Sequence, residues 1–133
     1  MANRLARALN RLSVIGDKCH TRVWAAYFMV LCNGWCTSAR FGGSCPCRLA
    51  CGAGEDTIKH FAHCRSVREI FHQKAGVELA PGALAMDDFL GVGGTFRTED
   101  ATISWALAVY ALYRVHNGRR HHLLATSEIP GAF

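Results

Sequence analysis

The sequence predicts a small, mostly α-helical domain organised around a compact cysteine- and histidine-rich motif. Three observations lead to this fold class. The chain has 133 residues, half of them hydrophobic, which suits one domain with a modest core. Apolar residues recur mostly at spacings of three and four, as on one face of a helix. Four of the seven cysteines and two of the seven histidines fall within residues 45–64. We therefore expect a single domain over residues 1–133.

Helices are predicted in the N-terminal part of the chain, residues 1–44. The first helix is expected from about residue 3 to residue 15, with Gly16 ending it. Its apolar stripe is expected to pack on the rest of the domain and consists of Leu5, Leu9 and Leu12. The same stretch has several arginines and no acidic residue, so a mitochondrial targeting peptide is an alternative, less favoured interpretation.

The second helix is predicted over residues 21–39. Trp35 falls at helical spacing from the aromatic residues before it, which favours a place in the core over stacking on a nucleic-acid base. Gly34 lies inside the pattern and either lowers the local helicity or admits a close neighbour. Residues 40–44, RFGGS, are expected to turn into the cysteine-rich motif.

Residues 45–64 read CPCRLACGAGEDTIKHFAHC. Cys47 and Cys51 form a Cys-x3-Cys pair, and His60 and Cys64 form a His-x3-Cys pair eight residues later. The second pair would share one face of a short helix that Asp56 caps. Zinc prefers thiolate and imidazole ligands in a tetrahedron, and these four side chains would complete one. The predicted fold class is therefore a mostly α, small helical domain held by a Cys-Cys-His-Cys zinc motif.

Two further residues of the motif are alternative ligands. Cys45 would make a tight chelate with Cys47, and His63 would point about a quarter-turn away from Cys64 on a helix. Four protein ligands leave no open position on the metal, so the zinc is expected to be structural and not to activate water. A zinc deaminase is excluded because the chain has no His-x-Glu motif.

The C-terminal helices are predicted within residues 65–122. Ser66-Val67-Arg68-Glu69 fits a capping box, so a helix of about ten residues is expected from Ser66 to a stop at Gly76. A short helix is expected over residues 83–90. Its Asp87-Asp88 pair superficially resembles a polymerase metal site, but no sheet or distant carboxylate accompanies it, and a solvated turn or helix start is the favoured interpretation.

The longest apolar helix is predicted to begin at Thr98 and to end at Asn117-Gly118. Thr98 can cap it, and acidic residues follow in the first turn. Residues 123–133 are expected to be a frayed tail. Apolar runs at residues 23–32 and 103–113 are shorter than the roughly 20 residues that a bilayer span needs, so we expect no membrane insertion.

The formal net charge of +5 is compatible with a phosphate-bearing partner. The odd count of seven cysteines and the chelating spacing of the clustered cysteines and histidines, with no secretory signal, favour a reducing compartment over a disulfide framework. We therefore expect an intracellular protein of the nucleus or cytoplasm.

Two stretches carry a resemblance to a known family. NGWCTSARF, residues 33–41, followed by the motif ending in GEDTIKHFAHC resembles the region beyond the polymerase core in reverse transcriptases of non-long-terminal-repeat (LINE-type) retrotransposons. The later WALAVYALYRVHNGRRH, residues 105–121, is similar to the apolar-then-basic helix of some members. The similarity covers about residues 20–122 and is specific at the zinc motif and at NGW.T. Many members have His-x4-Cys where this chain has His-x3-Cys.

The resemblance implies a C-terminal accessory piece without the palm, fingers or endonuclease, and hence no polymerase activity. It implies the same four zinc ligands, and contact with RNA or DNA through cations near the motif. These cations are Arg40, Arg48, Lys59, Arg65 and Arg68. One alternative hypothesis is a zinc-held domain that docks on a polymerase body or another protein without touching nucleic acid. Another is a polymerase fragment completed by a second chain.

Overall fold

The computed structural model describes residues 2–37, 39–43, 45–49, 51–77, 86–91 and 98–128. Most of them are helical. The elements are α1 (Ala2–Lys18), α2 (Thr21–Leu31), the 3-10 turn η1 (Ala39–Phe41), α3 (Ile58–Phe61), α4 (Arg65–Ala75), α5 (Met86–Phe89) and α6 (Glu99–Glu128). Extended pairing in these ranges is limited to an isolated bridge between Pro46 and Glu55. The predicted mostly helical fold class is confirmed.

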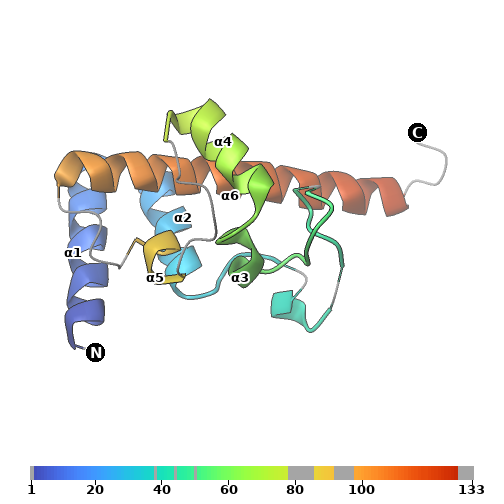
Figure 1. Ribbon diagram of the computed structural model, residues 1–133, viewed down its shortest axis with the longest axis horizontal. Coiled ribbons are helices and arrows are strands. Elements are labelled where there is room, and N and C mark those ends of the chain that lie inside the picture. The colour runs from blue at the N-terminus through green and yellow to red at the C-terminus, as the bar shows by residue number, and fades with distance from the viewer. Residues whose placement is uncertain are drawn as a thin grey trace.

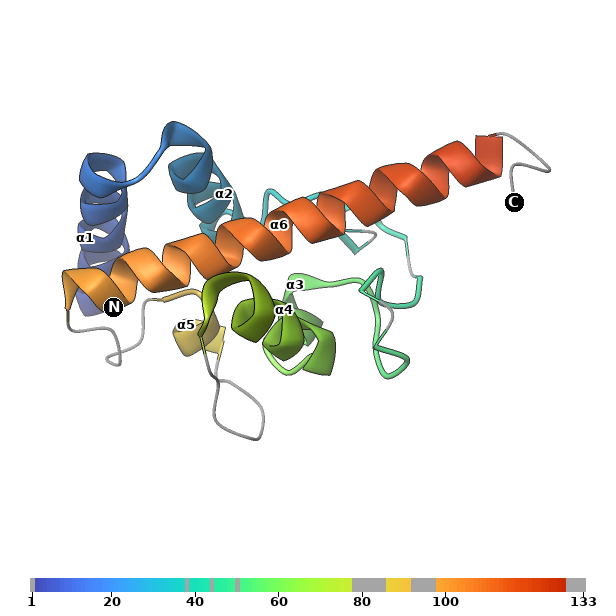
Figure 2. The same cartoon turned by 90° about the horizontal axis from the view of Figure 1, so that it is seen from above.

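Helix α6 is the element on which the others are assembled. It contacts α1, α2 and α4, and α1 also contacts α2. Figure 1 shows α6 running along the whole length of the molecule. Figure 2 shows α1 and α2 on one side of it and α4 on the other. No described helix is both long enough and apolar enough to span a bilayer.

The core is one continuous cluster in which the helices and the cysteine-rich loops take part. Its fully buried side chains come from all six α-helices and from the segment after α2, and include Ile15, Tyr27, Trp35, Phe61, Phe71, Phe89 and Leu112. Because Cys47, Cys51 and Cys64 belong to the same cluster, the packing of the helices and the order of the loops are energetically linked.

The buried tryptophan and tyrosine side chains that the structure describes donate to backbone carbonyl groups. Trp35 Nε1 donates to Ala26 O at 3.0 Å and Trp105 Nε1 donates to Phe89 O at 3.0 Å. The Tyr27 hydroxyl donates to Leu90 O at 2.6 Å. Burial raises the pKa of Tyr27 to about 12, so the phenol stays protonated and remains a donor. These bonds fix α2, α5 and α6 relative to one another.

The second helix ends earlier than the sequence predicts. α2 stops at Leu31 because Asn33 adopts a left-handed conformation, with φ of +52°. The Gly34 amide then donates to Met29 O at 2.6 Å, an approach so close that a Cβ on Gly34 would meet that oxygen at 3.2 Å. Trp35 therefore lies beyond the helix and folds back into the core, where it is fully buried. The prediction that Trp35 is a core residue is confirmed, and the prediction of a helix through residue 39 is wrong.

The first helix differs from its prediction at both its end and its packing. α1 continues through Gly16 to Lys18. Leu12 packs partly against the core, but Leu5 and Leu9 remain 64% and 58% exposed. The expectation that the whole leucine stripe packs on the domain is therefore wrong for its first two members.

The start of α4 also differs. Its N-cap is Cys64, without a side-chain capping hydrogen bond, and the helix begins at Arg65. The predicted capping box at Ser66 is therefore wrong, because Ser66 already lies in the first turn. The predicted stop is confirmed, since Gly76 is left-handed with φ of +66°. Of the short helix predicted over residues 83–90, α5 accounts for Met86–Phe89. Residues 83–85 and the side chains of Asp87 and Asp88 lie outside what the structure describes.

Helix α6 begins as predicted and ends later. The Thr98 hydroxyl accepts from the Ala101 amide at 3.1 Å, which confirms the predicted cap. The helix does not stop at Asn117-Gly118 and continues to Glu128, so residues 123–128 of the expected frayed tail are helical. Residues 129–133 lie outside the described part of the chain.

Candidate metal centre

Four side chains from the cysteine-rich motif converge in the interior of the protein. The Sγ atoms of Cys47, Cys51 and Cys64 and a ring nitrogen of His60 all lie within 4.8 Å of one another, and all four residues are buried. Cys47 Sγ lies 3.9 Å from Cys64 Sγ, and Cys51 Sγ lies 3.2 Å from His60 Nε2. This buried Cys3His group could hold a metal ion.

The first pair of side chains sits on a narrow loop. The Cys47 amide donates to Gly54 O at 2.9 Å and the Asp56 amide donates to Cys45 O at 3.0 Å, on either side of the Pro46–Glu55 bridge. Gly52 is left-handed, with φ of +76°, and lets the chain reverse directly after Cys51. The Ala53 amide donates to Cys51 Sγ at 3.4 Å, so the turn also provides a donor for the sulfur.

The second pair does not share one helix, contrary to the prediction. α3 ends at Phe61, and Cys64 is the residue that precedes α4. The α3 cap is Thr57 and not Asp56: the Thr57 hydroxyl accepts from the His60 amide at 2.9 Å. His60 on α3 and Cys64, just before α4, thus point toward the same site. The turn between the two helices brings them together, in place of the single helix that the sequence predicts.

Gly54 lies directly against the imidazole of His60. A Cβ placed on Gly54 would come within 2.3 Å of His60 ring atoms, closer than any two such atoms can pack. Glycine is therefore required at this position for the loop to hold the ring beside Cys51 Sγ.

We expect Gly54→Ala to displace His60 and to weaken metal binding by about 10-fold or more, as loss of ligand orientation does at other metal sites. The strain should also lower the free energy of unfolding by about 1–3 kcal/mol. Competition with a chromophoric chelator, using Zn²⁺ as the probe, measures the first effect. Gly118→Ala is the matched control, because a Cβ there meets no atom within 4 Å. Equal Zn²⁺ affinity in both variants would contradict the packing argument.

The protonation of the four side chains follows from their burial. Burial raises the pKa of Cys47 to about 12 and also raises the pKa of Cys64, although amides at the start of α4 partly offset the latter. Burial acts on Cys51 in the same direction, but the Ala53 amide, the neighbouring thiols and Arg65 outweigh it and lower the pKa of Cys51. Burial, followed by the charge of His63, lowers the pKa of His60 and favours the neutral imidazole.

A pH dependence of metal affinity follows. Without metal, the Cys47 and Cys64 thiols carry protons at neutral pH, and binding must release them. Raising the pH from 6.5 to 7.5 should therefore strengthen Zn²⁺ binding by about 100-fold or more, since at least about two protons leave. Chelator competition at the two pH values, corrected for protonation of the chelator, measures this change. An affinity that is unchanged with pH would contradict metal binding through these thiols.

A buried ionic cluster supports the loop from behind, and the sequence did not indicate it. Asp56 is fully buried, and its carboxylate accepts from Arg48 Nε at 3.0 Å and from His116 Nε2 at 2.8 Å. His116, on α6, is itself only 2% exposed, and its ring also lies against Phe61 and Trp35. We name Arg48, Asp56 and His116 the Asp56 cluster. It ties the cysteine-rich loop to α6.

The two alternative ligands lie outside the converging group. Cys45 is half-buried, and the 4.8 Å group does not include it. His63 is exposed, and its ring meets the ring of His60 edge-on at 5.5 Å between centroids. His63 therefore borders the group from the solvent side.

The five cations predicted to contact phosphates have different surroundings. Arg48 belongs to the Asp56 cluster, and Arg65 donates to Cys51 O at 3.0 Å, so both support the loops. Arg40 is exposed, and its guanidinium lies 5.1 Å from the ring centre of Phe41. Lys59 is exposed and Arg68 is half-buried. Arg40 and Lys59 are brought together as lining residues of one groove.

Comparisons of this chain with protein-family models, with curated proteins and with solved structures found no match.

Proposed function

We propose that this chain is a non-catalytic, zinc-stabilised domain that binds nucleic acid. The observation that carries the zinc assignment is the convergence of four buried ligand groups of the types that zinc prefers. A tetrahedral zinc with Zn–S of about 2.3 Å and Zn–N of about 2.0–2.1 Å needs ligand atoms about 3.5–3.8 Å apart. The distances of 3.9 Å between two sulfurs and 3.2 Å from sulfur to nitrogen are close to these values.

A structural role for the zinc follows from the same ligands. Cys47, Cys51, His60 and Cys64 would fill all four positions of a tetrahedron, so no position remains for water or substrate. The ligands come from a loop, from α3 and from the start of α4, which a bound ion would hold together. Three thiolates and one zinc ion carry a net negative charge, and Arg65 beside Cys51 would partly compensate it.

Nucleic-acid binding is supported by charge and by the resemblance of the motif to LINE-type reverse transcriptases. The chain carries a formal net charge of +5. Arg40 and Lys59, which the resemblance implicates, are both exposed and line one groove. We propose that these two side chains contact phosphates, while Arg48 and Arg65 act mainly by holding the loops.

Salt dependence tests the nucleic-acid proposal. If Arg40 and Lys59 neutralise about two phosphates of a single strand, raising the salt concentration from about 50 to 200 mM should weaken binding by about 7-fold. Fluorescence anisotropy of labelled single-stranded RNA and DNA measures this change. An affinity that does not vary with salt would rule out phosphate contacts.

A protein-docking function is the second candidate, because α1 exposes a leucine pair. Leu5 and Leu9 are 64% and 58% exposed, and Phe28 on α2 is 41% exposed. Leu5 and Leu9 are one helical turn apart on α1, and a contiguous exposed apolar patch is typical of a surface that meets another protein. A polymerase body or another protein would then cover α1. Two results together would favour this function. The wild type would bind no RNA or DNA, and its association with a partner protein would be lost in a Leu5→Glu/Leu9→Glu variant.

A further inference from the structure

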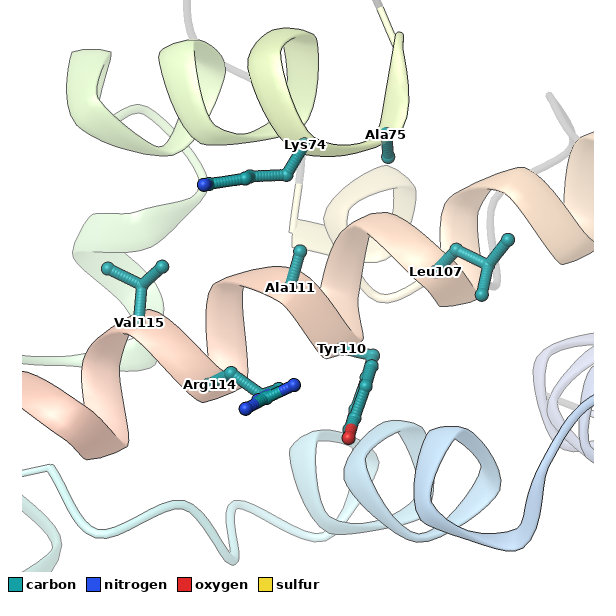
Figure 3. A pocket seen from close by; sticks show the side chains of 7 residues that line it. All are labelled: Lys74, Ala75, Leu107, Tyr110, Ala111, Arg114 and Val115. Carbon is teal, nitrogen blue, oxygen red and sulfur yellow. The ribbon is translucent and has the colours of Figure 1, made fainter.

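Two grooves lie on either side of the middle of α6. One, of about 720 Å³, runs between α6 and the end of α4, and Figure 3 shows its lining residues. The other, of about 490 Å³, lies between α6 and α2. Tyr110 and Arg114 line both grooves, so the two form one continuous surface across the helix. We name it the α6 surface.

The charged residues that the structure describes on the α6 surface are all cations. Lys74 comes from α4, Arg114 from α6 and Arg22 from α2, and all three are exposed. Among the residues that the structure describes, no aspartate or glutamate lines either groove. No ion pair is formed by these three side chains with the residues that the structure describes. Their charges are therefore available to an anionic ligand.

Two tyrosines lie among these cations. Tyr110 and Tyr113 are half-buried, which leaves part of each ring accessible. The ring of Tyr113 packs against the buried ring of Trp35, with 5.3 Å between the ring centroids. The Arg114 guanidinium lies 6.0 Å from the ring centre of Tyr110. Aromatic rings fixed between cations provide stacking platforms for bases whose phosphates the cations neutralise.

The alternative occupant, an acidic helical peptide, fits this surface less well. A helix that docks in a groove inserts several large apolar side chains into it. The groove beside α4 presents Leu107, 44% exposed, and half-buried Val115 as its aliphatic side chains, together with the small Ala111. The groove beside α2 adds half-buried Met29, together with Asn117 and Gly118, which favour hydrogen bonding and close backbone approach.

We propose that the α6 surface binds a single-stranded nucleic-acid segment, with Tyr110 stacking on a base and Arg22, Lys74 and Arg114 contacting phosphates. This inference rests on the proposed nucleic-acid function and assigns it a surface other than the one beside the metal centre. The strand crosses α6 between α2 and α4, in the space that the two grooves provide.

Anisotropy of fluorescent 12-mer oligouridylate and oligothymidylate with the zinc-loaded full chain tests the proposal. Tyr110→Ala should weaken binding by about 5- to 150-fold, the effect of losing one base stack, and Tyr110→Phe should retain it. Arg114→Gln should weaken binding and reduce the salt slope by about 0.7. Lys18→Gln, which removes an exposed cation at the end of α1, is the matched control and should change affinity by less than about 2-fold.

The RNA and DNA arms report which strand is preferred, and a 12-base-pair duplex should bind more weakly because its bases are not free to stack. Circular dichroism and zinc content verify that each variant is folded. If Tyr110→Ala fails to fold, the other two variants still test the proposal. Tyr110→Phe should keep the wild-type affinity, and Arg114→Gln should lower both the affinity and the salt slope.

The outcomes separate this inference from the proposed function. Wild-type affinity in both Tyr110→Ala and Arg114→Gln, with a loss in Lys59→Gln, would overturn the α6 surface and leave nucleic-acid binding beside the metal centre intact. If the wild type binds no oligonucleotide at about 50 mM salt, both proposals fall. Binding of a fluorescent oligoglutamate peptide in that case, dependent on Arg114, would assign the α6 surface to an acidic protein partner.

Discussion

Removing the metal should unfold the domain. Structural zinc sites contribute about 10–16 kcal/mol of binding free energy, which is comparable to the roughly 5–15 kcal/mol by which a small protein is stable. The three cysteines of the centre belong to the same core cluster as Phe61, Val67 and Leu112, so disorder of the loops would open the helical core. Addition of a strong chelator should therefore lower the helical circular-dichroism signal by about half or more and abolish a cooperative thermal transition.

Variants of single cysteines sharpen this test. Cys51→Ser should lose the metal, because it removes a sulfur from the converging group. Cys45→Ser is the matched control: it lies in the same loop but outside the group, and it should retain one zinc ion per chain and a thermal transition close to that of the wild type. Equal zinc content in the two variants, measured by elemental analysis, would show that the metal is not bound by the four residues assigned to it.

Breaking the Asp56 cluster should have the second-largest effect. In Asp56→Asn, the side-chain amide would direct N–H donors at Arg48 or His116, which are donors themselves, inside a site from which water is excluded. Removing one partner of a buried ion pair costs about 3–5 kcal/mol. We expect a loss of about 3 kcal/mol in urea unfolding of the zinc-loaded protein and a fall in melting temperature of about 10 °C.

The control for this prediction is Asp17→Asn, which makes the same chemical change at an exposed position on α1. It should alter stability by no more than about 0.5 kcal/mol. If Asp56→Asn were equally mild, the carboxylate would have no net role in stability. Chelator competition on the same variant should also show weaker zinc binding, because Asp56 anchors the loop that carries Cys47 and Cys51.

The features that local spacing determines could be predicted from the sequence. Cys47 and Cys51 are separated by three residues, and His60 and Cys64 by three more, so short turns alone can bring each pair together. Thr98 caps α6, which begins directly after it, and Gly76 ends α4, which it directly follows. In each case the residues that produce the structure are sequence neighbours, and their preferences are intrinsic to the backbone.

The features that depend on distant contacts could not be predicted. Asn117-Gly118 is a local stop signal, in which the glycine alone costs about 1 kcal/mol in a helix interior. However, His116 and Arg119 on either side contact Asp56 and Arg48, residues near the candidate metal centre. These contacts dock α6 across the loops and favour its continuation. Asp56 and His116 are 60 residues apart in sequence, so no spacing rule connects them. Asp56 therefore appeared to be a helix cap and Arg48 a phosphate contact.

The central position of α6 has a consequence for the synthesis of this protein. α1 and α2 are translated before α6, against which they pack, and α6 begins only after about 70 further residues. At about 5–20 residues per second the interval is about 4–14 s, during which the face of α2 that packs on α6 has no native partner. Chaperone engagement of the nascent chain should therefore begin at α2 and end when α6 has been synthesised.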